Sequence, residues 1–283
     1  MQVCTKTLGV LVSRATPIIL FCIGTTGCRA QTPKQEDPKK VGAHLMVHIP
    51  AQTVQLGRDG SVPYDEQPEW YEKIEDFYIT QTEVTNAEFV RFLNDADLNP
   101  RQVIQLLGYK GNSTRPSQIV YTGKRFRPSL GREKFPVATV TYDGAEAYCN
   151  WLNMRLPSEA EWVAAVRGGT QTSYPWGDTA SLDVANWGRE WKGYMPTTEV
   201  GSFQPNAYGI YDGMGNVWEW TSTQYLPYDG RSVSTDRKER KVLRGGDWFV
   251  QPHDISVYTR LALEPQVRGL MDGGVGFRCA MGA

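Results

Sequence analysis

Alternating apolar and polar positions open the ordered part of the chain, at about residue 43. Apolar positions 45, 47 and 49 alternate with His44, Met46 and His48, and this period of two predicts a strand whose 45/47/49 face lies toward the core. Both histidines are then expected on the outer surface. Four residues apart in a strand, they would be about 13 Å apart, too far to share a metal ion.

Three helices are predicted from N-cap signals followed by apolar residues on one face. Thr85 begins a capping box (TNAE) ahead of apolar positions 89, 92 and 93. Asp143, with a glutamate three residues later, is expected to start a second helix. Ser158 starts a third, which the Gly168-Gly169 pair ends.

Beyond residue 170 the helical period disappears, and short runs of Gly, Pro, Asn and Trp replace it. Such a stretch needs turns, aromatic side chains or metal ions to satisfy and hold its backbone. There is no internal repeat and no break in composition. We therefore expect one domain over residues 43–283.

The first 28 residues are typical of a secretory signal. Lys6 and Arg14 give a positive start, and the apolar run 15–23 is too short to span a membrane. The small residues before Cys28 resemble a bacterial lipoprotein signal, in which Cys28 becomes the lipidated first residue. Simple secretion with cleavage after Ala30 is the alternative, and a cytoplasmic protein a third. Residues 29–42 are polar and Pro-punctuated, which predicts a tether.

Charge narrows the set of partners. The 30 Lys and Arg against 31 Asp and Glu give a net charge of −1, which argues against a nucleic-acid partner. We expect an exported protein, periplasmic or membrane-anchored, that contacts the membrane only through a lipid on Cys28. Its partner is then a periplasmic small molecule, peptide or protein.

Export changes the interpretation of the five cysteines. Cys4, Cys22 and Cys28 belong to the signal or its processing site, so only Cys149 and Cys279 remain in the folded part. In an oxidising compartment these two are candidates for one disulfide. Two buried free thiols are the alternative.

Several motifs then occur in an order that identifies a family. They include EVTNAEFVRFLN, RLPSEAEWVAAVRGG, YPWGD, YDGMGNVWEW, VLRGGDW and GFRCA. Together they resemble the formylglycine-generating enzyme, or sulfatase-modifying factor, family over nearly all of the mature chain. The resemblance implies a single α+β domain of the C-type-lectin-like kind, low in regular secondary structure. It also implies that Cys149 pairs with Cys279.

The resemblance implies a structural calcium site in the segment YDGMGNVWEW. Its ligands would be the carboxylates of Asp212 and Glu219 and the backbone carbonyls of Gly215 and Val217. Two carboxylates and loop carbonyls suit calcium, a hard cation that takes six to eight oxygens. The alternative is that Glu219 forms a salt bridge and the glycines only permit the turn. A second family site would begin at Asn186, but its acidic ligand has no counterpart here.

The family's catalytic positions differ in this chain. The family enzyme oxidises a cysteine of a sulfatase with copper(I) held by two thiolates, which soft copper(I) prefers. Counted from Arg244-Gly245-Gly246, those positions are Val250 and Ile255. Asp247 replaces the serine after the two glycines. Copper is therefore not expected, and genuine formylglycine generation is the least favoured function.

Two functions remain. Some exported relatives, such as the pyoverdine-maturation type, are thought to modify an aromatic metabolite without the cysteine pair. We therefore expect a maturation or modifying enzyme, with siderophore chromophore maturation as an example, that uses Asp247 and His253 as catalytic residues and Trp218 in the substrate pocket. The alternative is a non-catalytic C-type-lectin-like binding or accessory lipoprotein that presents residues 249–273.

Overall fold

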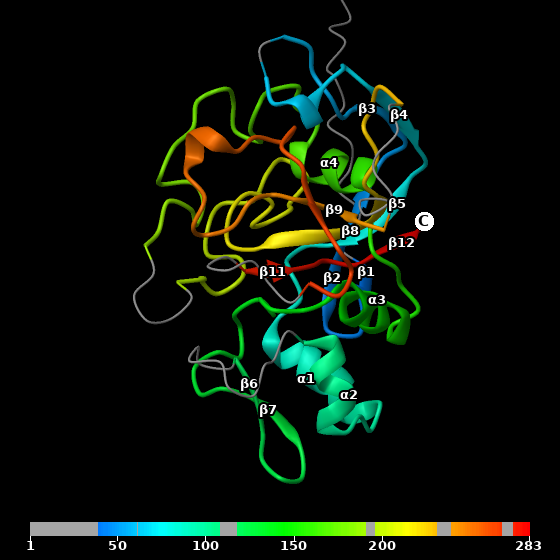
Figure 1. Cartoon of the computed structure of the whole chain (residues 1–283), viewed down its shortest axis with the longest axis vertical. Coiled ribbons are helices and arrows are strands. Elements are labelled where there is room, and N and C mark those ends of the chain that lie inside the picture. The colour runs from blue at the N-terminus through cyan, green and yellow to red at the C-terminus, as the bar shows by residue number, and fades with distance from the viewer. Residues whose placement is uncertain (1–38, 61, 108–117, 191–195, 231–238, 268–273) are drawn as a thin grey trace, which may run out of the picture. The chain divides into compact units, whose positions relative to one another are not determined.

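The computed structural model describes residues 39–60, 62–107, 118–190, 196–230, 239–267 and 274–283 (Figure 1). The signal, Cys28 and most of the predicted tether lie outside these residues. The described residues belong to one compact unit, Asp37–Ala283. In this described part, no helix is both long and apolar enough to cross a membrane.

The residues that the structure describes form four α-helices, all before residue 168: α1 (Asn86–Asp95), α2 (Pro100–Leu106), α3 (Tyr142–Trp151) and α4 (Glu159–Arg167). The predicted caps of α1 and α4 are confirmed, because Thr85 and Ser158 each form a complete capping box. Gly168 ends α4 in the left-handed conformation at φ 61°.

The predicted start of the second helix was wrong by two residues. Thr141 caps α3 by accepting a hydrogen bond from the backbone N–H of Gly144, so Asp143 lies inside the first turn. Helix α2 was not predicted. Asn99 caps it with a full capping box and Pro100 occupies its first turn, a signal that the weak apolar pattern of this short helix concealed.

Within the described ranges, twelve short strands form four sheets. The first sheet has the order β1-β2-β5-β12 and the second β10-β9-β8-β11, with separate pairs β3-β4 and β6-β7. Their bounds are β1 Lys39–Val41, β2 His44–Ile49, β3 Gln52–Gln55, β4 Tyr71–Ile74, β5 Phe77–Thr80, β6 Ile119–Tyr121, β7 Phe126–Pro128, β8 Trp218–Gln224, β9 Lys241–Arg244, β10 Leu261–Leu263, β11 Val275–Gly276 and β12 Ala280–Gly282. Single-turn 3-10 helices occupy Tyr64–Glu66 and Pro252–Asp254. The predicted α+β fold is confirmed.

The strand at His44 was predicted correctly, but its inner face was not. His44 and Met46 are buried, whereas positions 45 and 47 are only half-buried. The His44 ring contacts the Tyr148 hydroxyl at 2.7 Å and the Glu88 carboxylate at 3.4 Å. These partners satisfy its nitrogens inside the core, which is why a polar residue can occupy the inner face. His48 remains exposed, as expected.

The described structure also has strand β1 inside the predicted tether. Lys39–Val41 pairs with β2 across the Gly42 turn, so ordered structure begins before residue 43. The polar composition of this segment concealed it, since an edge strand can expose most of its side chains.

A disulfide joins helix α3 to the C-terminal part of the folded unit. Cys149 on α3 is bonded to Cys279, next to β12, with Cα atoms 5.6 Å apart and a sequence separation of 130. Both cysteines are fully buried among apolar side chains. The bond ties the helical half to the first sheet.

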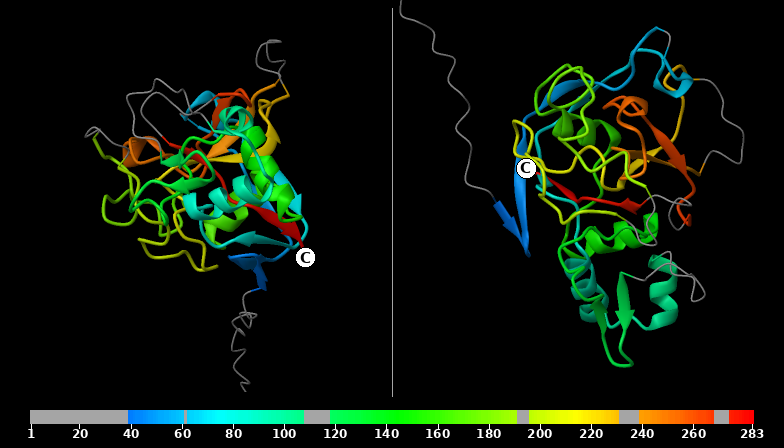
Figure 2. Two further views of the ribbon diagram at one scale, coloured as in Figure 1. Left: turned by 90° about the horizontal axis from the view of Figure 1, so that it is seen from below. Right: turned by 90° about the vertical axis from the view of Figure 1, so that its left-hand side faces the viewer.

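The chain after residue 170 is mostly irregular, as expected, and its described part wraps around sheet β10-β9-β8-β11 (Figures 1 and 2). Buried aromatic residues fill the spaces between its loops. Trp187, Trp220 and Trp248 are all fully buried there. Irregular backbone can therefore hold fixed positions for a site.

Candidate functional site

The turn that follows β9 is the centre of the candidate site. Gly245 and Gly246 adopt φ values of 97° and 77°, which only glycine takes without strain. Arg244 before them is fully buried and pairs with Glu159 at 2.6 Å. This anchored turn fixes the direction of the chain from Asp247 onward.

Val250 and Ile255 come together over this turn. A β-carbon added to Gly246 would lie 2.9 Å from Cγ2 of Val250 and 3.3 Å from Cγ1 of Ile255. Both side chains therefore face one α-carbon, although five residues separate them in sequence. Two apolar side chains meet at the positions that the motif count assigned to thiolates.

The structure does not bring Asp247 and His253 into contact. Asp247 is buried, and its Oδ1 accepts hydrogen bonds from the backbone N–H groups of Phe249 and Val250 at 3.0 and 3.3 Å. Burial raises the pKa of its carboxyl to about 6. His253 is exposed and lies 3.6 Å from Asp254. Asp247 thus shapes the turn, and His253 lies at the surface.

The segment Asp212–Glu219 runs beside this turn. The backbone N–H of Gly215 donates to the carbonyl of Gly245 at 2.9 Å. Asp212 and Asn216 both have positive φ, at 53° and 62°, so the segment is tightly folded.

Glu219 is fully engaged within the protein. Its two carboxylate oxygens accept hydrogen bonds from Nε and Nη2 of Arg278, both at 2.7 Å, and Oε2 also accepts one from Trp162 at 2.8 Å. All three residues are buried. The salt bridge that sequence analysis gave as the alternative role of Glu219 is therefore present.

One neighbour of this pair, Glu83, was missed from the sequence. Glu83 is fully buried, its Oε2 accepts from the Asn216 side chain at 2.7 Å, and its Oε1 has no hydrogen-bond partner among the described residues. Burial and the charges of Asp212 and Glu219 raise the pKa of Glu83. Glu83 lies inside the EVTN motif, where its alternation with apolar Val84 gave no sign of burial.

Ionising all three carboxyls of Glu83, Asp212 and Glu219 against the single guanidinium of Arg278 would leave an excess of buried negative charge, which a bound cation would offset. No three His, Cys, Asp or Glu side chains of the described chain form a metal-binding group. A cation would therefore depend on backbone carbonyls as well as on carboxylates, as in the expected set with Gly215 and Val217. Oε1 of Glu83, which has no hydrogen-bond partner among the described residues, is available as one of these carboxylate oxygens. Asn186 is bonded instead to Pro196 and Asn216.

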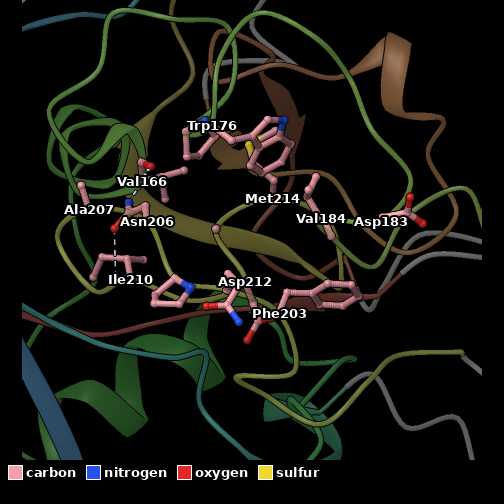
Figure 3. A pocket seen from close by; sticks show the side chains of 15 residues that line it. Val166, Trp176, Asp183, Val184, Phe203, Asn206, Ala207, Ile210, Asp212 and Met214 are labelled. Carbon is pink, nitrogen blue, oxygen red and sulfur yellow. Dashed lines mark hydrogen bonds between the residues drawn. The ribbon is translucent and has the colours of Figure 1, made fainter.

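Asp212, Gly213 and Met214 of this segment line a pocket of about 250 Å³ (Figure 3). Trp176 and Met214 border it opposite Phe203 and Asp212, and Val184 closes a third side. Of the described residues that line it, Asp183 and Asp212 are the charged ones. The sequence-predicted pocket residue Trp218 does not line it and is buried in the core instead.

The same residues contact both the pocket and the chain around the glycine turn. Gly213 lines the pocket, and its carbonyl oxygen would lie 3.1 Å from a β-carbon on Gly245. Trp176 stacks on Tyr174 with ring centroids 5.4 Å apart, and the Tyr174 hydroxyl donates to the Pro252 carbonyl at 3.0 Å. The pocket wall is thus connected to the segment that carries Val250 and Ile255.

This arrangement of turn, segment and pocket agrees with the motif resemblance. The sequence family described as "Sulfatase-modifying factor enzyme 1-like domain" matches residues 31–283. The chain belongs to this family. It is 27% identical to the formylglycine-generating enzyme of Mycobacterium tuberculosis, over 83% of this chain and 96% of that relative. It is 31% identical to the inactive C-alpha-formylglycine-generating enzyme 2 of Bos taurus, over 84% of this chain and 88% of that relative.

Two solved structures have the same fold. PvdO from Pseudomonas aeruginosa superimposes with a TM-score of 0.64 at 26% identity, covering 87% of this chain and 100% of PvdO. The Treponema denticola variable protein 1 has a TM-score of 0.61 at 25% identity, covering 87% of this chain and 98% of that one. The predicted family and fold are therefore confirmed.

Proposed function

We propose that this protein is an exported maturation or modifying factor that binds part of a small molecule or peptide in the Trp176–Phe203 pocket. The observation that carries the proposal is the connection between this pocket and the glycine turn. A ligand held against Trp176 and Met214 would lie on the wall that Tyr174 links to Pro252, between Val250 and Ile255, which the resemblance aligns with the family's catalytic positions. Because both side chains are apolar, the chemistry is other than copper–thiolate formylglycine generation.

The pocket's size and lining favour a small ligand group. Its volume of about 250 Å³ lies below the roughly 300–1,000 Å³ of pockets that enclose drug-sized ligands. One aromatic ring or one side chain would fill it, stacked on Trp176 or Phe203. This agrees with an aromatic metabolite, as in siderophore chromophore maturation, or with one residue of a peptide.

Calcium is part of the proposal as a structural ion. Asp212 and Glu83 would supply carboxylate oxygens, with Gly215 and Val217 supplying carbonyls and Glu219 shared with Arg278. When bound, the ion would neutralise buried charge beneath the pocket. Asp212 would then hold the pocket wall in place and take no part in chemistry.

Location is also a proposal. We infer export from the signal-like first 28 residues, with a lipid on Cys28 or simple secretion, into the periplasm. The disulfide between Cys149 and Cys279 supports this inference, since such bonds persist in oxidising compartments.

A non-catalytic binding protein is the second candidate. It is favoured by the separation of Asp247 and His253, which leaves the expected acid–base pair unassembled. The same pocket would then retain its ligand unchanged. Asp247 and His253 as catalytic residues stay a prediction.

Mass-spectrometric comparison of exported metabolites and proteins between wild-type and deletion strains tests the proposal. We expect an unmodified precursor to accumulate in the deletion strain. Complementation with Trp70→Ala should remove the precursor, and complementation with Trp176→Ala should not. The two tryptophans are matched controls, because they are similarly exposed at 45% and 39% and only Trp176 lines the pocket.

Identical mass spectra in the two strains would contradict the modifying role and favour the non-catalytic binding protein. Aldehyde formation on a cysteine-bearing sulfatase peptide with copper(I) would contradict the altered chemistry. Complementation with His253→Ala tests whether His253 is catalytic. If it is only an exposed surface residue, the variant should restore the wild-type spectrum.

A further inference from the structure

A basic surface lies far from the candidate site, where hairpin β6-β7 meets helix α1. The hairpin projects from the folded unit at the end that carries α1 and α2 (Figures 1 and 2). The segment 119–127 (IVYTGKRFR) contains three cations and no acid, in a chain of net charge −1. Positive charge is therefore concentrated here.

The hairpin is firmly attached to the helix. Asn94 of α1 accepts a hydrogen bond from the backbone N–H of Phe126 at 3.0 Å and donates one to its carbonyl at 3.1 Å. Ile119 and Phe126 are buried on the inner face. Directly opposite each other in the register, Val120 and Arg127 share the outer face. The surface is thus held in place by the fold.

A hollow of about 480 Å³ separates the helix from the hairpin. Arg91, Lys124, Arg125 and Arg127 line it, against the single carboxylate of Asp95. Among the residues that the structure describes, none of these four cations has an ion-pair partner. Unpaired cations around a hollow attract a multiply bonding anion such as a phosphate.

Apolar side chains accompany these cations. Val120 is 41% exposed on the outer face, and Tyr121 is 47% exposed on the opposite face, where its ring centroid lies 5.0 Å from that of Phe126. A phosphodiester backbone makes no use of an exposed valine. A membrane surface uses both features, because headgroup phosphates attract lysine and arginine while aliphatic and tyrosine side chains enter the interface.

We propose that hairpin β6-β7 and helix α1 form a docking surface for anionic phospholipid headgroups. The hollow takes a headgroup phosphate, and the hairpin meets the membrane with its tip, so that Val120 on one face and Tyr121 on the other both reach the interface. This contact is separate from a lipid on Cys28 and does not depend on the proposed modifying function. It would orient a tethered domain on the membrane.

Vesicle binding by the unit Asp37–Ala283 tests this surface without the signal segment. That unit contains the described core and the disulfide, so it is expected to fold alone. We expect binding to phosphatidylglycerol-containing vesicles, weakening with salt, and none to phosphatidylcholine alone. Each cation at an anionic surface contributes about fivefold, so Lys124→Gln/Arg125→Gln should lose on the order of 25-fold.

Lys40→Gln/Lys73→Gln is the matched control, because it removes the same charge from exposed positions on β1 and β4. It should leave vesicle binding unchanged. Tyr121→Ser should weaken binding without changing its salt dependence. Equal binding to both vesicle types would overturn the proposal, as would equal losses in the two double variants. Binding to duplex DNA but not to vesicles would also overturn it and assign the surface to nucleic acid.

Discussion

Arg278 donates hydrogen bonds to both carboxylate oxygens of Glu219, at 2.7 Å each, and both side chains are fully buried. The same guanidinium donates from Nη2 to the Tyr211 carbonyl at 2.9 Å and lies within 3.3 Å of the Thr80 and Gln81 carbonyls. It therefore joins the end of β5, the Asp212 segment and β8. The pair is a structural link between the first sheet and the candidate site.

Removal of the Arg278 side chain should strongly destabilise the fold. Arg278→Ala leaves Glu219 buried and unpaired, which typically costs about 3–5 kcal/mol. Urea unfolding measures the loss. The control is Arg155→Ala, since Arg155 also binds both oxygens of a glutamate, Glu161, but is 47% exposed. That exposed pair should contribute less than about 1 kcal/mol. Similar losses in both variants would contradict the structural role.

Val250 and Ile255 provide a second test, because their side chains face the same glycine. Val250→Cys/Ile255→Cys should create a pair of thiolates that binds copper(I) more tightly than either single variant. Competition with a chromophoric copper(I) chelator measures the affinities. If the double variant bound no more tightly than Val250→Cys alone, the two positions would not be close enough to share an ion.

Calcium should stabilise the protein through Asp212. At a concentration one hundred times its Kd, a ligand of the native state adds about 2.7 kcal/mol, which appears as a higher Tm in calcium than in EGTA. Asp212→Ala should abolish the difference. Asp183→Ala should preserve it, because Asp183 lines the same pocket but is exposed. A calcium response in Asp212→Ala would place the ion elsewhere.

The sequence predicted the parts of the fold that rest on local signals. Ser158 and Gly168 mark the two ends of α4, and hydrogen bonds within the helix itself determine both. Motif order predicted the family, and the count from Arg244 correctly paired Val250 with Ile255 in space.

Predictions that depended on tertiary contacts were weaker. His44 follows the period of an outer face, but Tyr148, 104 residues away, makes its burial favourable. The burial of Glu83 depends on Asn216, 133 residues away. Trp176 lines the pocket and Trp218 lies in the core. Tertiary packing determines both places, and the spacing of residues along the sequence does not reveal it. Long-range partners decided these positions.

Asp247 should make stability depend on pH in the acidic range. Its pKa of about 6 in the folded protein exceeds the value of about 3.9 in an unfolded chain. Between these values the native state retains a proton that the unfolded state has lost, so stability falls as pH rises from about 4 to 6. The loss attributable to this group is about 3 kcal/mol, and it is complete above pH of about 6.

Asp247→Asn isolates this effect, because the amide oxygen can still accept from Phe249 and Val250 but does not titrate. Urea unfolding of both proteins across this range gives the difference in stability, and contributions from Asp212 and other groups cancel in the subtraction. The difference should change by about 3 kcal/mol for Asp247→Asn and stay constant for the exposed Asp254→Asn. A constant difference for both would mean that Asp247 is charged in the native turn, and that its backbone hydrogen bonds outweigh its burial.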